Sequence, residues 1–245
     1  METVDILVLS TLIFAAAALY SSVGHGGASG YLAAMGLMGV APAVMKPTAL
    51  VLNLLVASLA ALQFGRARAF SWSTFWPFAA GSIPMAYLGG YLGVSTSTYQ
   101  VLVGLVLLYA AYRLWRRPTM AEKAVRKPPL LLALLAGAGI GFLSGVVGVG
   151  GGIFLSPLLL FAGWADPKTT AGVSAVFILV NSASGLLGHL SSVSAIPPEG
   201  MWLVLAAGAG GALGSRLGSR RFGDARLRRL LGVVLVVAGG KMIVA

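Results

Sequence analysis

Long apolar runs, separated by short breaks of polar residues, glycine or proline, cover almost the whole chain of 245 residues. Most runs are close to the ~20 residues that a helix needs to cross the hydrocarbon core of a bilayer. The pattern predicts an all-α integral membrane protein. Its ten expected transmembrane segments are 5–22, 26–41, 46–64, 73–93, 98–115, 129–146, 150–163, 168–190, 200–217 and 226–244.

Composition supports a membrane protein, since 58% of the residues are hydrophobic and only 9% are charged, whereas a soluble domain has about a quarter charged residues. The net charge of +11 would suit nucleic acid, but Lys and Arg form short clusters between apolar runs. Such clusters are typical of cytoplasmic loops. We therefore expect no nucleic-acid partner, and with no cysteine in the chain, no thiolate metal site.

The positive charges also predict an orientation. If all ten segments cross and both termini lie outside, the inside loops hold every Lys and Arg except Lys46 and Lys241, as the positive-inside rule requires. The alternative topology makes 26–41 and 150–163 re-entrant loops and puts the N-terminus inside. It would place the basic cluster 216–229 outside, so the charges disfavour it.

The sequence is also a duplication. Val23–Gly27 (VGHGG) aligns with Val147–Gly151 (VGVGG) at an offset of 124 residues. We expect a first five-helix repeat at 1–117, a basic cytoplasmic linker at 118–128 and a second repeat at 129–245. Because five is an odd number of crossings, the second repeat enters the membrane inverted, an arrangement typical of secondary transporters.

The segments that begin at Gly26 and Gly150 are short. About 15 residues of helix span ~22 Å, against a hydrocarbon core of ~30 Å, so the chain is expected to be unwound at the glycines. Unwound backbone at membrane depth normally lines a cavity, and exposed helix N-termini attract anions. The alternative is close helix packing, which we expect for other glycines such as 208–211. The expected anion-binding backbone is Gly24, Gly26, Gly27, Gly148, Gly150, Gly151 and Gly152.

Four side chains are the main candidates for chemistry. Asn53 and Asn181 could contact anion oxygens or form interhelical hydrogen bonds. His25 could carry a coupled proton or remain neutral and bonded to backbone. Lys46, expected at a helix start before Pro47, could attract anions to the outer mouth or extend to lipid headgroups. Further uncharged polar groups on the third and eighth segments are Ser58, Gln63, Ser174, Ser182 and Ser184.

The two glycine turns, SSVGHGGASGYL and LSGVVGVGGGIFLSPLLL, are each followed by a helix start marked by Pro or Thr, at Lys46-Pro47-Thr48 and Lys168-Thr169-Thr170. With the basic linker, they make nearly the whole chain resemble the sulfite exporter TauE/SafE family, also called the toluene sulfonate uptake permease family. The resemblance implies secondary transport of small sulfur-containing or organic anions across a bacterial or archaeal inner membrane. The first turn has His25 where the second has Val149, and such side chains would select among anions.

We therefore expect a secondary transporter of sulfite, a sulfonate or a related organosulfur anion, with protons as the candidate coupling ion. We expect no enzyme activity, cofactor or metal site; the partners are the small anion and the bilayer, and a homo-oligomer is compatible with this. One alternative is a metal or cation transporter with His25, Met35, Met38 and Met45 as ligands, but no acidic residue lies mid-segment. A non-transporting scaffold and an uncoupled channel are the others.

Overall fold

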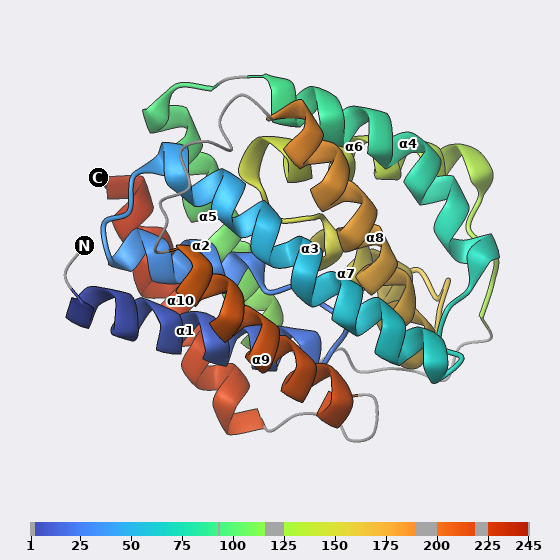
Figure 1. Ribbon diagram of the computed structural model, residues 1–245. Helices are drawn as coiled ribbons and strands as arrows, with labels where there is room; N and C mark the ends of the chain where they lie inside the picture. Colours follow the sequence, from blue (N-terminus) through green and yellow to red (C-terminus); the bar gives the residue numbers. More distant parts are fainter. Residues whose placement is uncertain (1–2, 93, 116–124, 190–199, 219–224, 245) are drawn as a thin grey trace.

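The computed structural model describes residues 3–92, 94–115, 125–189, 200–218 and 225–244, and all regular structure in these ranges is α-helical (Figure 1). Each of the ten predicted segments corresponds to one helix, with ends that differ by a few residues. The helices are α1 Thr3–Ser21, α2 Ala28–Leu37, α3 Pro42–Arg66, α4 Trp72–Tyr91, α5 Thr96–Trp115, α6 Leu130–Val147, α7 Gly152–Phe161, α8 Pro167–Gly188, α9 Gly200–Gly218 and α10 Ala225–Val244.

Four of these helices, α1, α3, α6 and α8, are long and apolar enough to cross a membrane, while α2 and α7 are shorter apolar helices of 10 residues each. The outer surface exposes large apolar side chains, including Leu131 and Leu135 on α6 and Phe161 at the end of α7. In water such exposure would be unfavourable. In a bilayer these faces meet lipid tails, so the structure fits a multi-pass membrane protein.

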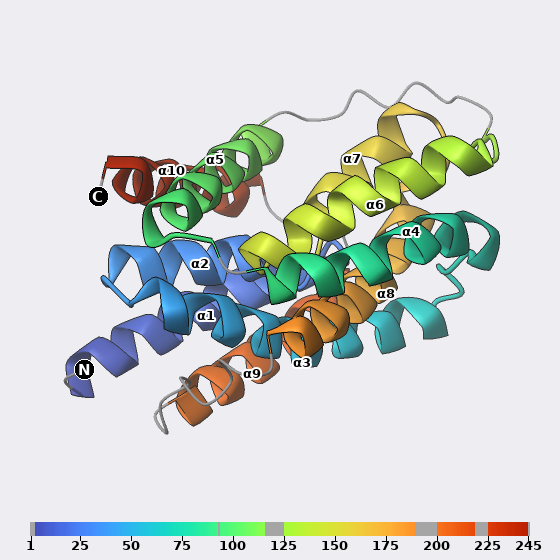
Figure 2. The same cartoon turned by 90° about the horizontal axis from the view of Figure 1, so that it is seen from above.

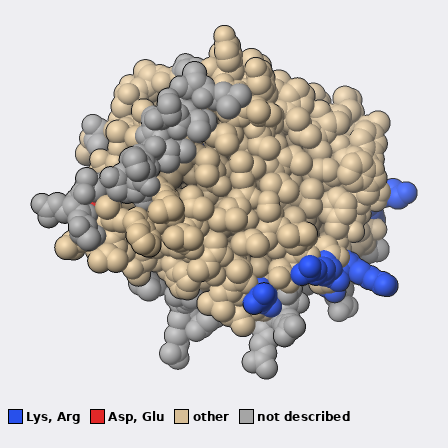
Figure 3. All heavy atoms as spheres, in the orientation of Figure 1, with Lys and Arg blue, Asp and Glu red and all other residues tan. Residues whose placement is uncertain are grey.

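The helices form a bundle in which α3 and α8 run side by side across the middle. Figure 2 shows α5 paired with α10 on one side and α6 beside α4 and α7 on the other. Both chain ends lie at the same side of the molecule in the two views. In Figure 3, the visible Lys and Arg gather at the opposite, lower right side, near the end of α3.

Glycines allow two helix pairs to pack backbone against backbone. Gly137, Gly141 and Gly145 recur every fourth residue on α6, and a Cβ atom at any of them would overlap a backbone carbonyl of α4. Helices can approach this closely only where small residues face the partner. The prediction that the glycines of 208–211 serve packing is confirmed, since an added Cβ atom would meet Leu55 at Gly208, Phe14 at Gly210 and Val56 at Gly211. The same four-residue spacing joins α9 to residues 14–22 through Gly210, Gly214 and Gly218.

The start of α3 differs from the prediction. The helix begins at Pro42, so Lys46 and Pro47 lie inside it and not at its first turn. Proline is favoured at the first helical position because that residue has no intrahelical partner for an N–H group. Pro42 therefore starts the helix, whereas Pro47 lies inside it, where proline cannot donate the usual bond to the carbonyl four residues earlier.

Candidate functional site

Each glycine turn breaks the chain between a long helix and a short one. The first turn, 22–27, joins α1 to α2, and the second, 148–151, joins α6 to α7. Gly24 and Gly27 in the first turn, and all three glycines of the second, have φ values between +73° and +105°. This left-handed backbone is costly for any residue with a Cβ atom, so glycine is required here.

The two short helices begin directly at these turns. Gly27 and Gly151 are their N-cap residues, and neither helix start has a side-chain cap. The first N–H groups of a helix have no intrahelical acceptor, and together with the helix dipole they form a partially positive end. Both short helices therefore have a partially positive end at the turns that no capping side chain satisfies.

Asn53 on α3 lies against both turns. A Cβ atom on Gly26 would overlap the Asn53 amide, and one on Gly150 would lie 3.0 Å from Asn53 Nδ2 and 2.8 Å from Ser182 Oγ. Asn53 and Ser182 are fully buried. In the described part of the chain, neither amide atom of Asn53 nor the Ser182 hydroxyl has a hydrogen-bond partner. Three buried polar atoms thus lie unsatisfied beside the turns.

Ile178 on α8 faces Asn53 across the turns. A Cβ atom added to Gly26 would lie 3.0 Å from Ile178 Cγ2, and one added to Gly150 would lie 2.7 Å from the same atom. Asn181 lies one helical turn further along α8 and is also fully buried. Its Nδ2 donates to the Phe177 carbonyl at 2.8 Å, while its Oδ1 has no partner among the described residues. Asn53 and Asn181 therefore occupy different positions relative to the turns.

His25 connects the first turn to the second half of the chain. Its Nδ1 lies 3.1 Å from the Val23 carbonyl and its Nε2 lies 3.2 Å from Ser156 Oγ on α7. Ser156 in turn lies 2.7 Å from Ser174 Oγ on α8. A small pocket with room for about one water molecule adjoins the ring. Its lining includes Tyr20, His25, Gly26, Ser29, Ile153 and Ile178.

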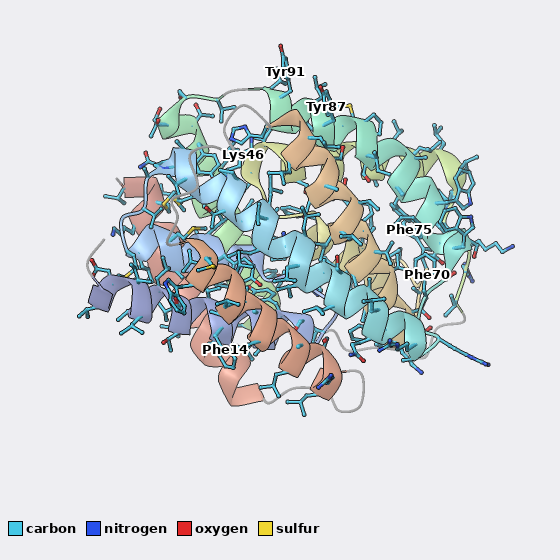
Figure 4. The ribbon with its side chains drawn as sticks, in the orientation of Figure 1. Phe14, Lys46, Phe70, Phe75, Tyr87 and Tyr91 are labelled. Carbon is cyan, nitrogen blue, oxygen red and sulfur yellow. The ribbon has the colours of Figure 1, made fainter. Side chains whose placement is uncertain are left out.

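Lys46 is 6% exposed. Its stem packs on the second glycine turn, where a Cβ atom on Gly148 would lie 3.2 Å from Lys46 Cγ. Its Nζ donates to the Gly90 carbonyl at 3.2 Å, near the upper end of α8 in Figure 4. Because Gly90 is in the last turn of α4, the ammonium group caps the negative end of that helix. Lys168, by contrast, is exposed.

The residues proposed for a cation site are not gathered around His25. Met35 and Met45 are buried in the apolar cluster around α2. Within the described ranges no group of three His, Asp or Glu residues could hold a metal ion.

Ser156 and Ile178 were missed by the sequence analysis. Ser156 follows the second glycine turn in the same LSPL motif, which was a signal that it could face the site. Ile178 gave no signal, because an isoleucine within an apolar helix is ordinary.

Comparison with known proteins supplies the family. No solved structure matched the chain. The probable membrane transporter protein y4hK of Sinorhizobium fredii is 40% identical over 245 residues, covering 96% of this chain and 97% of that protein. The probable membrane transporter protein YunE of Bacillus subtilis is 23% identical, covering 83% and 82%. Residues 9–242 match the family described as Sulfite exporter TauE/SafE. The chain therefore belongs to this family of membrane transporters.

Proposed function

We propose that the protein is a secondary transporter that binds a small sulfur oxyanion, of the sulfite or sulfonate type, between its two glycine turns. The observation that carries this proposal is the set of unsatisfied groups around Asn53. A buried polar atom without a partner costs about 1–3 kcal/mol, so an anion that accepts from Asn53 Nδ2 and from the Ser182 hydroxyl would recover that cost for these two groups. Anion oxygens can accept from Nδ2, from the hydroxyl and from the N–H groups of the turns.

The charges around the turns support an anion over a cation. Of the acidic residues that the structure describes, Asp5 lies in the first turn of α1 and Asp166 caps α8. Neither lies in the middle of a helix, where a cation site would need a counter-charge. The uncapped N-termini of α2 and α7 favour negative charge at the glycine turns.

The packing of the helices supports the proposed inverted repeat and its role in alternating access. If α1 to α5 correspond to α6 to α10, the α4–α6 pair corresponds to the α9–α1 pair, and both are close pairs with glycines at every fourth residue. The same correspondence exchanges α3 with α8 and α5 with α10, and the two helices of each of these pairs are in contact. Exchanging the conformations of two such halves would open the site to alternate sides of the membrane. We place both termini outside, opposite the basic residues at the end of α3.

Uptake in proteoliposomes tests the proposal. Purified protein is reconstituted with internal sulfite, sulfate, an alkyl sulfonate or chloride, and counterflow of the labelled anion is measured. We expect saturable exchange of a sulfur oxyanion. Asn53→Leu keeps the side-chain volume but removes the amide, and the loss of a hydrogen bond to a charged group, about 1.5–3 kcal/mol, should raise KM ~10- to 100-fold.

The matched control is Ser184→Ala. Ser184 is buried on α8 and donates to the Ile83 carbonyl on α4, away from the turns. It should leave KM unchanged. Equal KM values for Asn53→Leu and wild type, or no exchange of any sulfur anion by the wild type, would overturn the proposed site.

A further inference from the structure

A continuous line of hydroxyl groups runs from His25 into the second half of the protein. His25 Nε2 contacts Ser156 Oγ at 3.2 Å, and Ser156 Oγ contacts Ser174 Oγ at 2.7 Å. Ser156 is 6% exposed and Ser174 is fully buried. The contacts join a turn, α7 and α8, so the line is a tertiary arrangement that no local sequence motif requires.

The line continues along α8 toward its N-terminus. Thr170 precedes Ser174 by one helical turn, is 3% exposed, and its Oγ1 has no hydrogen-bond partner in the described part of the chain. Asp166 precedes Thr170 by another turn and lies exposed at the start of the helix. Residues four apart lie on the same helix face. Ser174, Thr170 and Asp166 therefore lead from the buried hydroxyl pair to the surface.

The positions of the first half that correspond to this line carry no hydroxyl group. The 124-residue offset of the turns pairs Ser156 with Leu32. The first residues of α3 and α8, Pro42 and Pro167, are 125 residues apart, and this offset pairs Ser174 with Ala49 and Thr170 with Met45. Leu32, Ala49 and Met45 are buried and apolar. The polar line therefore leads in one direction only, to the side of the membrane on which α8 begins.

The surroundings of His25 contain few other groups that exchange protons. The centroid of the Tyr20 ring on α1 lies 6.4 Å from that of the His25 ring. The Tyr31 hydroxyl on α2 donates its hydrogen bond to the Gly26 carbonyl at 2.6 Å. The charge that acts on His25 is Arg113 on α5, whose guanidinium lies over the Phe161 ring of α7. From α7, His25 meets the Ser156 hydroxyl and a backbone hydrogen bond of Gly152. From α8, Ile178 lines the same pocket as His25, and the Ser174 hydroxyl lies behind Ser156.

We propose that Ser156, Ser174 and Thr170 form a proton path between His25 and the side of the membrane on which α8 begins. This inference rests on the proposed function, because it gives that transporter its route for the coupled proton. Protonated His25 releases its Nε2 proton to Ser156 Oγ while Ser156 passes its own hydroxyl proton to Ser174. Ser174 passes its proton through one water molecule to Thr170, which releases a proton to water near Asp166. Each hydroxyl gains and loses one proton, and His25 ends neutral.

The test separates transport from coupling. Wild type, Ser174→Ala, Ser174→Thr and Ser156→Ala are reconstituted into vesicles. Anion exchange is measured by counterflow without a pH gradient, and coupling is measured as anion accumulation driven by a pH gradient, with a dye recording the proton flux. We expect the alanine variants to keep exchange but to lose gradient-driven accumulation by at least about tenfold, the scale of a lost proton-transfer group. Ser174→Thr, which keeps a hydroxyl, should restore accumulation.

Ser184→Ala again serves as the matched control, since it removes a buried α8 hydroxyl outside the line. Melting temperatures of all variants identify any that fail to fold. If either Ser156→Ala or Ser174→Ala fails to fold, the other variant alone tests the path. Normal accumulation in both alanine variants would overturn the path. Wild-type exchange without proton flux would overturn the path and leave the anion site intact, whereas no exchange by the wild type would overturn the proposed function and the path with it.

Discussion

Replacing Gly150 by alanine would place a methyl group between the two elements that we assign to the anion. The new Cβ atom would lie 2.7 Å from Ile178 Cγ2, 2.8 Å from Ser182 Oγ and 3.0 Å from Asn53 Nδ2. All three distances are too short for unperturbed contact, and the space they surround is the space in which an anion would meet the amide and the hydroxyl.

Two separate costs contribute. Gly150 has φ +73°, and alanine in this left-handed region costs about 1–2 kcal/mol. Forcing a methyl group into a packed site costs a further ~1–3 kcal/mol. Only the second cost acts on the anion site.

Gly39 separates the two costs. Its φ is +72°, and a Cβ atom there would meet nothing within 4 Å. Gly39→Ala should therefore lower the melting temperature through the backbone alone and leave KM for the sulfur anion unchanged. Gly150→Ala should lower the melting temperature further and raise KM by at least about tenfold, the effect of ~1.4 kcal/mol. If the two alanine variants transport with the same KM, the second turn does not hold the anion.

Two further predictions concern stability. Gly141→Ala would push a Cβ atom into the Ser82 backbone on α4 and should destabilise the protein by about 1–3 kcal/mol. The control is Gly139→Ala on the open face of the same helix, which should be neutral or stabilise by up to ~1 kcal/mol. Thermal unfolding in detergent compares the two variants, and equal melting temperatures would contradict the proposed packing role of Gly141. Asp166→Ala removes the N-cap of α8, whose carboxylate accepts from the N–H groups of Lys168 and Thr169, and should cost about 1 kcal/mol. Burial raises the pKa of the Asp166 carboxyl, but the hydrogen bonds from Thr169 and Lys168 outweigh it and lower that pKa below its usual value. The stabilisation is therefore present above the unfolded-state pKa of about 4 and is lost as the pH falls through the folded-state pKa. Wild type and Asp166→Ala should differ in melting temperature at pH 7 and converge in acid. A difference that persists after the folded-state carboxylate is protonated would show that the charge of the cap is not what stabilises α8.

The helices could be predicted from sequence because the bilayer imposes one simple requirement. Each crossing needs a run of apolar residues, and in lipid the backbone must satisfy its own hydrogen bonds. The broken short helices could be predicted for the same reason, since the runs from Gly26 and Gly150 were too short to cross. The start of α3 was misplaced because Pro42 and Pro47 both resemble a helix start, and only the structure shows which one begins the helix.

The side chains at the turns were harder to predict because they depend on helix rotation. Asn53 and Asn181, the two candidate amides, are 128 residues apart, whereas the turns align at an offset of 124. The residue that contacts Gly26 and Gly150 from α8, as Asn53 does from α3, is Ile178. Three residues change the position along the helix by about 4.5 Å, which is enough to move an amide away from the turns.

The resulting site combines a repeated backbone with side chains that differ between the halves. Gly24 packs against Ala171, while its counterpart Gly148 packs against Lys46. In the same way, Asn53 on α3 faces Ile178 on α8 across the turns. In inverted-repeat transporters the substrate site lies where the two repeats meet, and backbone N–H groups can serve there from both halves because they do not depend on side-chain identity. The selection of one anion over another needs groups that differ in polarity, and the positions where α3 and α8 meet the turns are where the two halves differ.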